Sequence, residues 1–363
     1  MTPSCPWKWH TLIGVTLLAA MLIVLSVGSA PSASFLARSS APTTSLAASE
    51  LRIPVGSSSS THPSSRYASG TAYDAKDGYV VMFGGKNLTT FFDDTWKYSG
   101  GVWTKLSPKT HPSVRGFPAM TYDAADGYVL LFGGYGPSGD LNDTWEFSAG
   151  QWTQLHPKSA PSVRFGASVS FDPAANYTLL FGGLDGVQNL SASKIYSDTW
   201  SYTAGEWTEL HPVDHPSPRV GAGMTFDPKD GYLVLFGGCT GPVGFCQGPT
   251  SDTWTFSAGA WTNVTSADHP SPRGGMGMAY DAADGYVFLF GGADNTTTFN
   301  DSWTYLGGVW TELSPPKHPF GLVGVDFAYD SADQYILLFG GYHLPPKVKS
   351  DTWTYSDGTW TKV

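Results

Sequence analysis

The chain of 363 residues contains 43 glycines, 26 prolines and 14 tryptophans, and only 14% of its residues are charged. This composition favours strands and turns. The formal net charge of -10 argues against a nucleic-acid partner, since binding to phosphates depends on a basic patch.

The N-terminal residues have the order of a secretory signal. Lys8 precedes an apolar run from Leu12 to Val27, and Gly28, Ser29 and Ala30 follow. Basic, apolar and small residues in this order are typical of a signal peptide. The apolar run is shorter than the about 20 residues that span a bilayer. We therefore interpret residues 1–30 as a signal peptide cleaved near Ser29 or Ala30, with an uncleaved membrane anchor as the alternative.

Residues 31–65 are rich in Ser, Ala, Thr and Pro and have no hydrophobic periodicity. Such a composition cannot bury an apolar face, so we expect a flexible linker.

A sixfold repeat occupies the remainder of the chain. In each copy an apolar run ends in a Gly-Gly pair, and Asp-Thr-Trp or Asp-Ser-Trp follows. A second Trp comes seven residues after the first. The Gly-Gly pairs begin at Gly84, Gly133, Gly182, Gly237, Gly291 and Gly340. The Trp pairs are Trp96 and Trp103, Trp145 and Trp152, Trp200 and Trp207, Trp254 and Trp261, Trp303 and Trp310, and Trp353 and Trp360.

The Gly-Gly pair, the aromatic residue downstream and the Trp near the end of each copy resemble the kelch repeat, over residues 66–363. Galactose oxidase carries a kelch-type propeller as its central domain. The resemblance implies an all-β, six-bladed β-propeller of four-stranded antiparallel blades. We expect one monomeric ring, with blades at about 66–108, 115–157, 164–212, 219–265, 273–315 and 322–363.

Each copy can also be divided into four strands, A to D, from its turn signals. Asp-x-x-Asp-Gly, as at 74–78, predicts a tight A–B turn, and Asn176 and Gln334 replace its Gly in two copies. Gly-Gly, Ala-Gly or Asp-Gly predicts the C–D turn. Because no strand is left over at either end, we expect blade one to close the ring by packing on blade six, with Leu51 to Val55 as an extra edge strand.

Variation between the copies is confined to one face. The A–B and C–D turns share one end of the blades and are nearly identical, whereas the B–C and D–A loops share the other end. The B–C loops at 184–197 and 239–251 are the longest. Since binding usually resides in variable loops on a rigid scaffold, we expect the binding surface there.

An arginine begins strand A in five copies, and Leu322 replaces it in the sixth. We favour an ion pair across the Gly-Gly pair to the Asp of Asp-Thr-Trp, because an extended Arg reaches across two strand spacings of about 4.8 Å. The alternative is a ring of guanidinium groups that binds an acidic ligand. In some kelch relatives, arginines on this face bind acidic peptides. The arginines are Arg66, Arg115, Arg164, Arg219 and Arg273.

Two further features occur near the same end of the ring. Asp326 stands in strand A of blade six, where other copies have Gly, Ala or Ser, and is a candidate for a lone carboxylate in the channel. Five His-Pro steps invite a metal hypothesis, but one histidine per blade cannot converge on a single ion, so we interpret them as turns. They begin at His62, His111, His215, His269 and His318.

Two observations favour export. Cys239 and Cys246 are the only cysteines after the signal region, and their spacing permits a local disulfide. Every asparagine is followed at the second position by Ser or Thr. Asn142 and Asn300 follow the repeat template, so we expect glycosylation among the others. These are Asn87, Asn176, Asn189, Asn263 and Asn295.

We therefore expect a secreted or cell-surface module that binds an extracellular protein or glycan without catalysis. It would need no cofactor or metal, and it would touch a membrane only through an uncleaved anchor. An extracellular carbohydrate-active enzyme, oxidase or sialidase-like, is the alternative. However, neither the copper site of galactose oxidase nor the arginine cluster of sialidases can be matched to this chain. A structural role in a cell envelope is a third reading.

Overall fold

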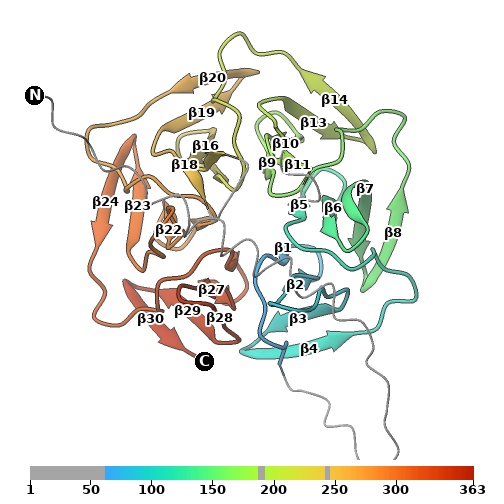
Figure 1. The fold of residues 1–363 in the computed structure, drawn as a ribbon, viewed down its shortest axis with the longest axis horizontal. Helices are drawn as coiled ribbons and strands as arrows, with labels where there is room; N and C mark the ends of the chain where they lie inside the picture. The colour runs from blue at the N-terminus through green and yellow to red at the C-terminus, as the bar shows by residue number, and fades with distance from the viewer. Residues whose placement is uncertain (1–61, 187–192, 242–245) are drawn as a thin grey trace, which may run out of the picture. The chain divides into compact units, whose positions relative to one another are not determined.

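The computed structural model describes residues 62–186, 193–241 and 246–363. All elements among them are strands, which form six four-stranded antiparallel sheets, arranged as the blades of a β-propeller, and three two-stranded ribbons (Figure 1). The signal peptide, Leu51 to Val55 and Asn189 lie outside the described residues. Within the described ranges, no helix is long and apolar enough to cross a membrane.

Each blade is built from four strands that are consecutive in the chain apart from short insertions. Blade one contains β1 (Gly70–Asp74), β2 (Tyr79–Phe83), β3 (Thr95–Ser99) and β4 (Val102–Leu106); blade two contains β5 (Ala119–Asp123), β6 (Tyr128–Gly136), β7 (Gly139–Ser148) and β8 (Gln151–Leu155); blade three contains β9 (Ser168–Asp172), β10 (Tyr177–Phe181), β13 (Thr199–Thr203) and β14 (Glu206–Leu210). Blade four contains β15 (Gly223–Asp227), β16 (Tyr232–Phe236), β19 (Thr253–Ser257) and β20 (Ala260–Asn263); blade five contains β21 (Gly277–Asp281), β22 (Tyr286–Phe290), β23 (Ser302–Leu306) and β24 (Val309–Leu313); blade six contains β25 (Asp326–Asp330), β26 (Tyr335–Phe339), β29 (Thr352–Ser356) and β30 (Thr359–Lys362).

The two repeated turns have the predicted chemistry. In the A–B turn of blade one, the Asp74 carboxylate accepts the backbone N–H groups of Lys76 and Asp77 at 3.1 and 3.2 Å. The residue that ends this turn has a positive φ in every blade, including Asn176 at 58° and Gln334 at 57°. In the C–D turn both central residues have positive φ, as in Gly100 and Gly101. Positive φ at both positions identifies two-residue type I′ hairpins.

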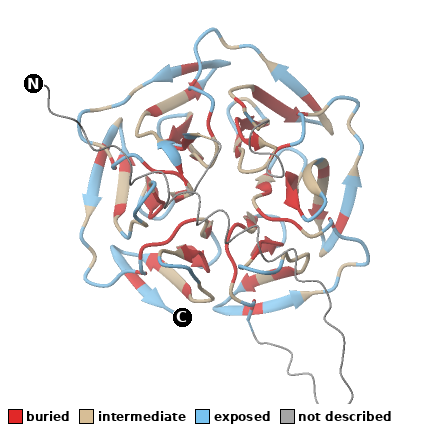
Figure 2. Ribbon diagram, viewed as in Figure 1, coloured by how far each residue is buried: buried red, intermediate tan, exposed pale blue. Residues whose placement is uncertain are grey.

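The core lies between blades, and strand B is its centre. The side chains of strand B are almost wholly buried on both faces (Figure 2). The second Trp of each blade packs on the preceding blade, as where the Trp152 ring lies 5.1 Å from the Phe83 ring. Trp103 of blade one packs on Phe339 of blade six at 5.0 Å, so the closing interface has the same packing as the others.

The Asp-Thr-Trp motif connects neighbouring blades. Its hydroxyl residue accepts the indole N–H of the second Trp of the next blade at 2.9–3.1 Å in all six interfaces. Trp152 donates to Thr95 in this way, and Trp103 donates to Thr352 across the closure. Ring closure by packing, without an exchanged strand, is therefore confirmed for the described residues.

A second circle of hydrogen bonds joins the blades at the axis. Just before strand A, one residue of each blade donates its backbone N–H to the carbonyl of the equivalent residue in the preceding blade, at 2.7–3.0 Å. All six residues have a positive φ, which favours glycine. They are Ala68, Phe117, Gly166, Gly221, Gly275 and Gly324.

The B–C connections are partly ribbons, which the sequence did not predict. In blade two, β6 and β7 run on to Gly136 and Gly139. Three other blades carry separate two-stranded ribbons: β11 (Leu184–Asp185) with β12 (Lys194–Ile195), β17 (Cys239–Gly241) with β18 (Gln247–Pro249), and β27 (Tyr342–His343) with β28 (Lys347–Val348).

Candidate functional site

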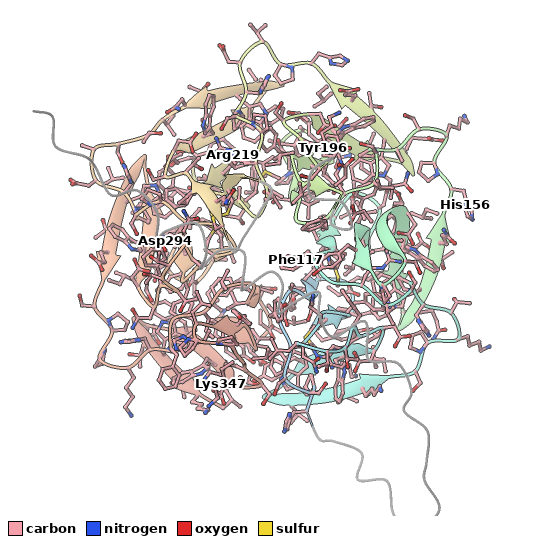
Figure 3. All side chains as sticks on the ribbon, in the orientation of Figure 1. Phe117, His156, Tyr196, Arg219, Asp294 and Lys347 are labelled. Carbon is pink, nitrogen blue, oxygen red and sulfur yellow. A yellow bond between two sulfur atoms is a disulfide. The ribbon has the colours of Figure 1, made fainter. Side chains whose placement is uncertain are left out.

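The end of the ring that carries the B–C and D–A connections is the candidate binding surface, and we call it the mouth face. Figure 3 marks residues of its connections, with Phe117 close to the axis and Tyr196, Asp294 and Lys347 on other blades. The backbone under it is held by the axial circle of hydrogen bonds. Its side chains are therefore presented by a rigid frame.

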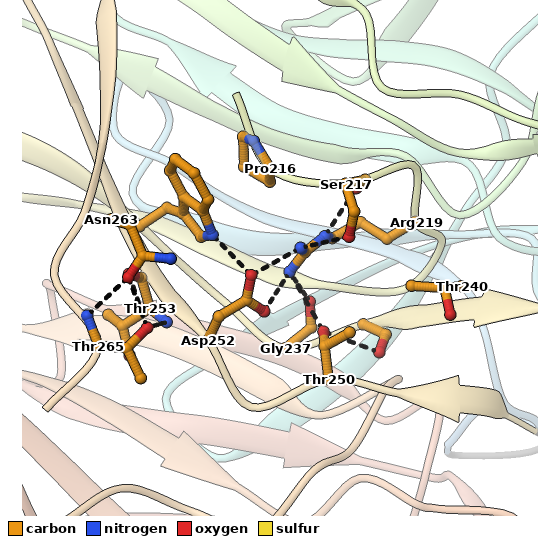
Figure 4. A network of polar contacts seen from close by, with 12 residues as sticks. Pro216, Ser217, Arg219, Gly237, Thr240, Thr250, Asp252, Thr253, Asn263 and Thr265 are labelled. Atoms are coloured by element: carbon orange, nitrogen blue, oxygen red, sulfur yellow. Dashed lines mark hydrogen bonds and ion pairs between the residues drawn. The ribbon is translucent and has the colours of Figure 1, made fainter. Parts of the chain in front are cut away.

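The N–H donors of the arginines on this face are used in contacts within the fold, as Arg219 illustrates (Figure 4). Its guanidinium group makes a bidentate pair with Asp252 at 2.7 and 2.8 Å. It also donates to the Gly237 carbonyl at 2.9 Å and to the carbonyl and hydroxyl of Ser217 at 3.0 and 2.9 Å. These contacts use all five N–H donors of an arginine.

The same arrangement recurs in the other four arginine-bearing blades. Each arginine side chain is at most 1% exposed, and its guanidinium group pairs with the Asp of its own Asp-Thr-Trp or Asp-Ser-Trp motif at 2.5–2.7 Å. Burial alone would raise the pKa of Asp252, but the hydrogen bonds and charge of Arg219 outweigh burial and lower it. The predicted Arg–Asp ion pair across the Gly-Gly pair is confirmed. An acidic ligand would have to displace an aspartate to reach any of these arginines.

Blade six departs from this pattern. Leu322 takes the place of the arginine and is buried. The aspartate of this blade, Asp351, pairs instead with Lys362 at 2.7 Å, and the Lys362 side chain is 52% exposed. The sixth blade thus replaces a buried ion pair by apolar packing and a surface pair.

The histidine of each His-Pro step makes a local hydrogen bond within an irregular connection. In each one, the histidine Nδ1 lies 2.9–3.0 Å from the carbonyl oxygen of the following proline, so Nδ1–H donates to it. Among the described residues, no three His, Cys, Asp or Glu side chains are grouped so that they could hold a metal ion.

Asp326 lies on the axial channel, at the interface between blades six and one. Its side chain is 1% exposed, and its Oδ1 accepts the backbone N–H of Ser69 at 2.9 Å. Its Oδ2 is buried without a hydrogen-bond partner. Burial raises the pKa of Asp326 to about 7, although the hydrogen bonds of Ser69 and the charge of Arg66 act against burial.

Cys239 and Cys246 form a disulfide that shapes the mouth face. Their Cα atoms lie 5.2 Å apart, and both residues are buried. The disulfide packs on Gly274 of blade five, where an added Cβ would lie 2.2 Å from the Cys239 sulfur. The bridge therefore fills a space that a side chain on Gly274 would otherwise occupy.

The described sequons lie on different parts of the ring. Asn87 and Asn295 are in B–C connections on the mouth face, whereas Asn176 is in an A–B turn at the opposite end. Asn263 ends β20, and its side-chain oxygen accepts the N–H and O–H groups of Thr265 at 3.0 and 2.8 Å.

Sequence reasoning missed an aromatic cluster on the mouth face. The rings of Tyr67, Tyr135 and Phe165 lie 6.0–6.1 Å from the ring of Phe117, and we call these four residues the aromatic collar. Phe117 and Phe165 are half-buried, so part of the collar faces solvent. Phe117 has a φ of 53°, a conformation that is rare for a bulky residue. The sequence contained one indication of this cluster: when the copies are aligned, Phe117 stands where four of the other copies have glycine.

Lys86 was missed as well. Its ammonium group donates to the Tyr135 hydroxyl at 2.8 Å and lies 4.6 Å from the centre of the Phe91 ring. The side chain is 7% exposed, and burial lowers its pKa to about 8. Its stem lies over Gly116, where an added Cβ would be 3.5 Å away.

Six four-stranded blades around one axis define the chain as a six-bladed β-propeller. Two family models match it: the Attractin/LZTR1 beta-propeller over residues 45–243, and the KLHDC2/KLHL20/DRC7 Kelch-repeats domain over residues 174–363. The chain belongs to the kelch-repeat β-propellers, a fold typical of protein-binding modules. No curated protein matches the chain.

Proposed function

We propose that the protein is a non-catalytic binding module, secreted or held at the cell surface, that engages an extracellular protein or glycan through its mouth face. The aromatic collar is the observation that carries this proposal. Large aromatic side chains supply much of the binding energy of protein interfaces at a low cost in conformational entropy. Here two of the four rings, Phe117 and Phe165, are half-buried on the one face that differs between blades, and they rest on the buried Tyr67 and Tyr135.

The geometry of Phe117 supports the same conclusion. A left-handed conformation costs a bulky residue free energy of about 1–3 kcal/mol, and such strain clusters at functional sites. Glycine occupies the equivalent position in four blades and alanine in one. A phenylalanine here is therefore unfavourable for the backbone but places a ring beside the channel.

Export is supported by independent features. The N-terminal segment has the order of a signal peptide, and the disulfide between Cys239 and Cys246 is of a kind that persists in oxidising compartments. The sequons are used only in the secretory route of a glycosylating cell. The intact mass of secreted protein tests cleavage, disulfide and glycans together.

The experiment that tests binding is a screen of the full chain against glycans and cell-surface proteins, repeated with Phe117→Gly. Glycine relieves the left-handed backbone and removes the ring, so the variant should stay folded and bind at least about tenfold more weakly. Val309→Ala is the matched control, because Val309 is an exposed apolar residue on an outer strand.

Equal binding by wild type and Phe117→Gly would show that the aromatic collar is not part of the binding site. Turnover of sugars or sialosides by the wild-type chain would favour the alternative, a carbohydrate-active enzyme.

A further inference from the structure

The mouth face of blade six carries an exposed basic and aromatic patch that shares no residue with the aromatic collar. It consists of Phe320, which precedes strand A, Lys347 in β28, Lys349 before β29, and Lys362 at the end of β30, and we call these four residues the basic rim. Phe320 is 63% exposed, the Lys362 side chain is 52% exposed, and Lys347 is exposed as well (Figure 3). A ligand therefore reaches these side chains without displacing any part of the fold.

Phe320 and Lys349 stand at repeat positions that have a different chemistry in other blades. Phe320 occupies the position of the serine that accepts a hydrogen bond from the arginine, as Ser64 does from Arg66 at 3.1 Å. Lys349 occupies the position of an aromatic residue whose ring stacks on the arginine in three blades, at 4.0–4.1 Å. These aromatic residues are Phe92, Tyr196 and Phe299. In blade six, therefore, a cation stands at the aromatic position and a ring stands at the serine position.

This exchange moves a cation–π contact from the interior to the surface. The Lys349 ammonium group lies 4.4 Å from the centre of the Phe320 ring, and the buried Leu322 takes the place of the arginine. In the three other blades the cation of the contact is a buried arginine whose charge an aspartate neutralises. In blade six the cation is a half-buried lysine next to an exposed ring.

The backbone that carries Phe320 is fixed by neighbouring connections. The Gly321 carbonyl accepts the Nδ1–H of His343 at 2.7 Å, and His343 pairs with Lys347 in the ribbon of β27 and β28. An added Cβ on Gly321 would overlap the Thr298 carbonyl of blade five. The loop of Phe320 and the ribbon of Lys347 are thus joined directly, which limits the conformational entropy that a ligand has to remove.

The lysines of the basic rim are close enough to repel one another. Burial and the charges of Lys347 and Lys362 lower the pKa of Lys349, against the opposing charge of Asp351. Asp351 in turn pairs with Lys362 at 2.7 Å. Three ammonium groups and one carboxylate leave a local excess of positive charge on a chain whose formal net charge is -10. An anionic ligand would relieve this repulsion.

We propose that the basic rim binds an anionic polysaccharide, with sulfate or carboxylate groups at the three lysines and a sugar ring against Phe320. Lysine ammonium groups are point charges on flexible stems, so they follow anionic groups that are spaced along a polymer. The C–H groups on the face of a sugar ring carry partial positive charge and pack on the negative face of an aromatic ring, as a cation does. The choice of a saccharide rests on the extracellular location in the proposed function.

Other polyanions fit the basic rim less well. An anionic membrane is bound by an apolar face that inserts together with the basic residues, and the rim contributes one ring. A nucleic acid needs a more extensive basic surface. A run of acidic residues in a protein offers the charges without a ring face for Phe320.

Binding of the full chain to dextran sulfate and to polygalacturonate, measured by biolayer interferometry at low ionic strength, tests the proposal. Neutral dextran, poly-L-glutamate and vesicles that contain anionic phospholipid are the reference ligands. We expect saturable binding of a charged polysaccharide that weakens as salt is added, and no binding of neutral dextran. The two charged polymers distinguish sulfate from carboxylate as the preferred group.

The double variant Lys347→Gln, Lys349→Gln should bind about tenfold more weakly, with roughly threefold from each exposed ion pair. Phe320→Ser restores the serine of the five arginine-bearing blades, so the variant should fold, and it should bind about threefold more weakly. The double variant Lys76→Gln, Lys229→Gln is the matched control. Both lysines are exposed in A–B turns at the opposite end of the ring, and the change in net charge is the same.

Three results would overturn the proposal: no saturable binding of either charged polysaccharide, an equal loss of affinity in the control double variant, or unchanged affinity in Phe320→Ser. Tighter binding of poly-L-glutamate or of the vesicles would also overturn it, and would assign the basic rim to a protein or to a membrane. The proposed function depends on Phe117→Gly in a separate screen, so its failure can be distinguished from a failure of the basic rim.

Discussion

Replacing Arg164 by leucine tests whether the buried ion pairs stabilise the ring. The substitution copies blade six, where Leu322 stands naturally. It removes the bidentate pair with Asp198, the bond to the Gly182 carbonyl and the bonds to Ser162. Breaking a buried pair from one side usually costs about 3–5 kcal/mol, because the remaining charge is left buried.

The structure places the expected cost near the lower end of this range. The Asp198 side chain is 21% exposed and keeps the hydrogen bond from the Trp200 indole N–H at 2.8 Å. We therefore expect Arg164→Leu to lower the free energy of unfolding by about 3 kcal/mol. Adding Asp198→Asn removes the stranded charge and should restore part of the loss, roughly 1–2 kcal/mol.

Urea unfolding of the wild type, both single variants and the double variant at pH 7 gives the coupling energy. Lys362→Met is the control, because it breaks the exposed pair with Asp351 and should change the stability by less than about 1 kcal/mol. The pKa of Asp198 is lowered in the folded protein by Arg164, which outweighs the opposite effect of burial. The contribution of the pair should therefore be complete at neutral pH and be lost as the pH falls below about 4.

A loss of less than about 1 kcal/mol in Arg164→Leu would refute this reasoning, since leucine packing alone would then suffice, as it does at Leu322. Additive single variants would show that the arginine acts through Ser162 and Gly182 rather than through Asp198.

Two further predictions concern the seam between blades six and one. Because the pKa of Asp326 rises from 3.8 to about 7 on folding, wild-type stability should decrease from about pH 4 to pH 7, by up to roughly 4 kcal/mol, and then level off. In Asp326→Asn, the melting temperature should change less with pH across this range than in the wild type. An equal pH dependence in both proteins would show that Asp326 is not its source. Trp103→Phe removes the closing hydrogen bond to Thr352, and Trp310→Phe removes the equivalent bond to Thr253. Each should cost about 1–2 kcal/mol in urea unfolding, whereas a much larger cost for Trp103→Phe would identify the closure as the weakest interface.

Features that depend on one blade alone could be predicted from the sequence. The A–B turn requires an aspartate and a residue that tolerates positive φ, so Asp74 and even Gln334 were assigned correctly. The Arg–Asp pair follows from strand spacing and from the missing side chains of the Gly-Gly pair between the two residues. Because each motif recurs in the copies of the repeat, its residues could be recognised as structural requirements rather than chance occurrences.

Features that depend on two neighbouring blades could not be predicted in the same way. The axial circle of hydrogen bonds is formed by backbone atoms, which every residue has. The frequent glycines just before strand A were therefore its only indication in the sequence. The collar and Lys86 arise because side chains of blades one to three meet at the axis, and nothing in the local sequence gives that distance. The ribbons of the B–C connections contain too few residues for a strand pattern to be recognised.

The indole hydrogen bonds also differ in how far apart their two partners lie along the chain. Each second Trp donates to the blade that precedes it in the chain, so blades two to six find their acceptor already synthesised. Trp103 is the exception, since its acceptor, Thr352, lies close to the C-terminus. During synthesis, one flank of blade one, with the indole of Trp103, stays unpartnered until the last blade emerges. A chain that ended before blade six would leave that apolar flank, with the indole of Trp103, without its partner.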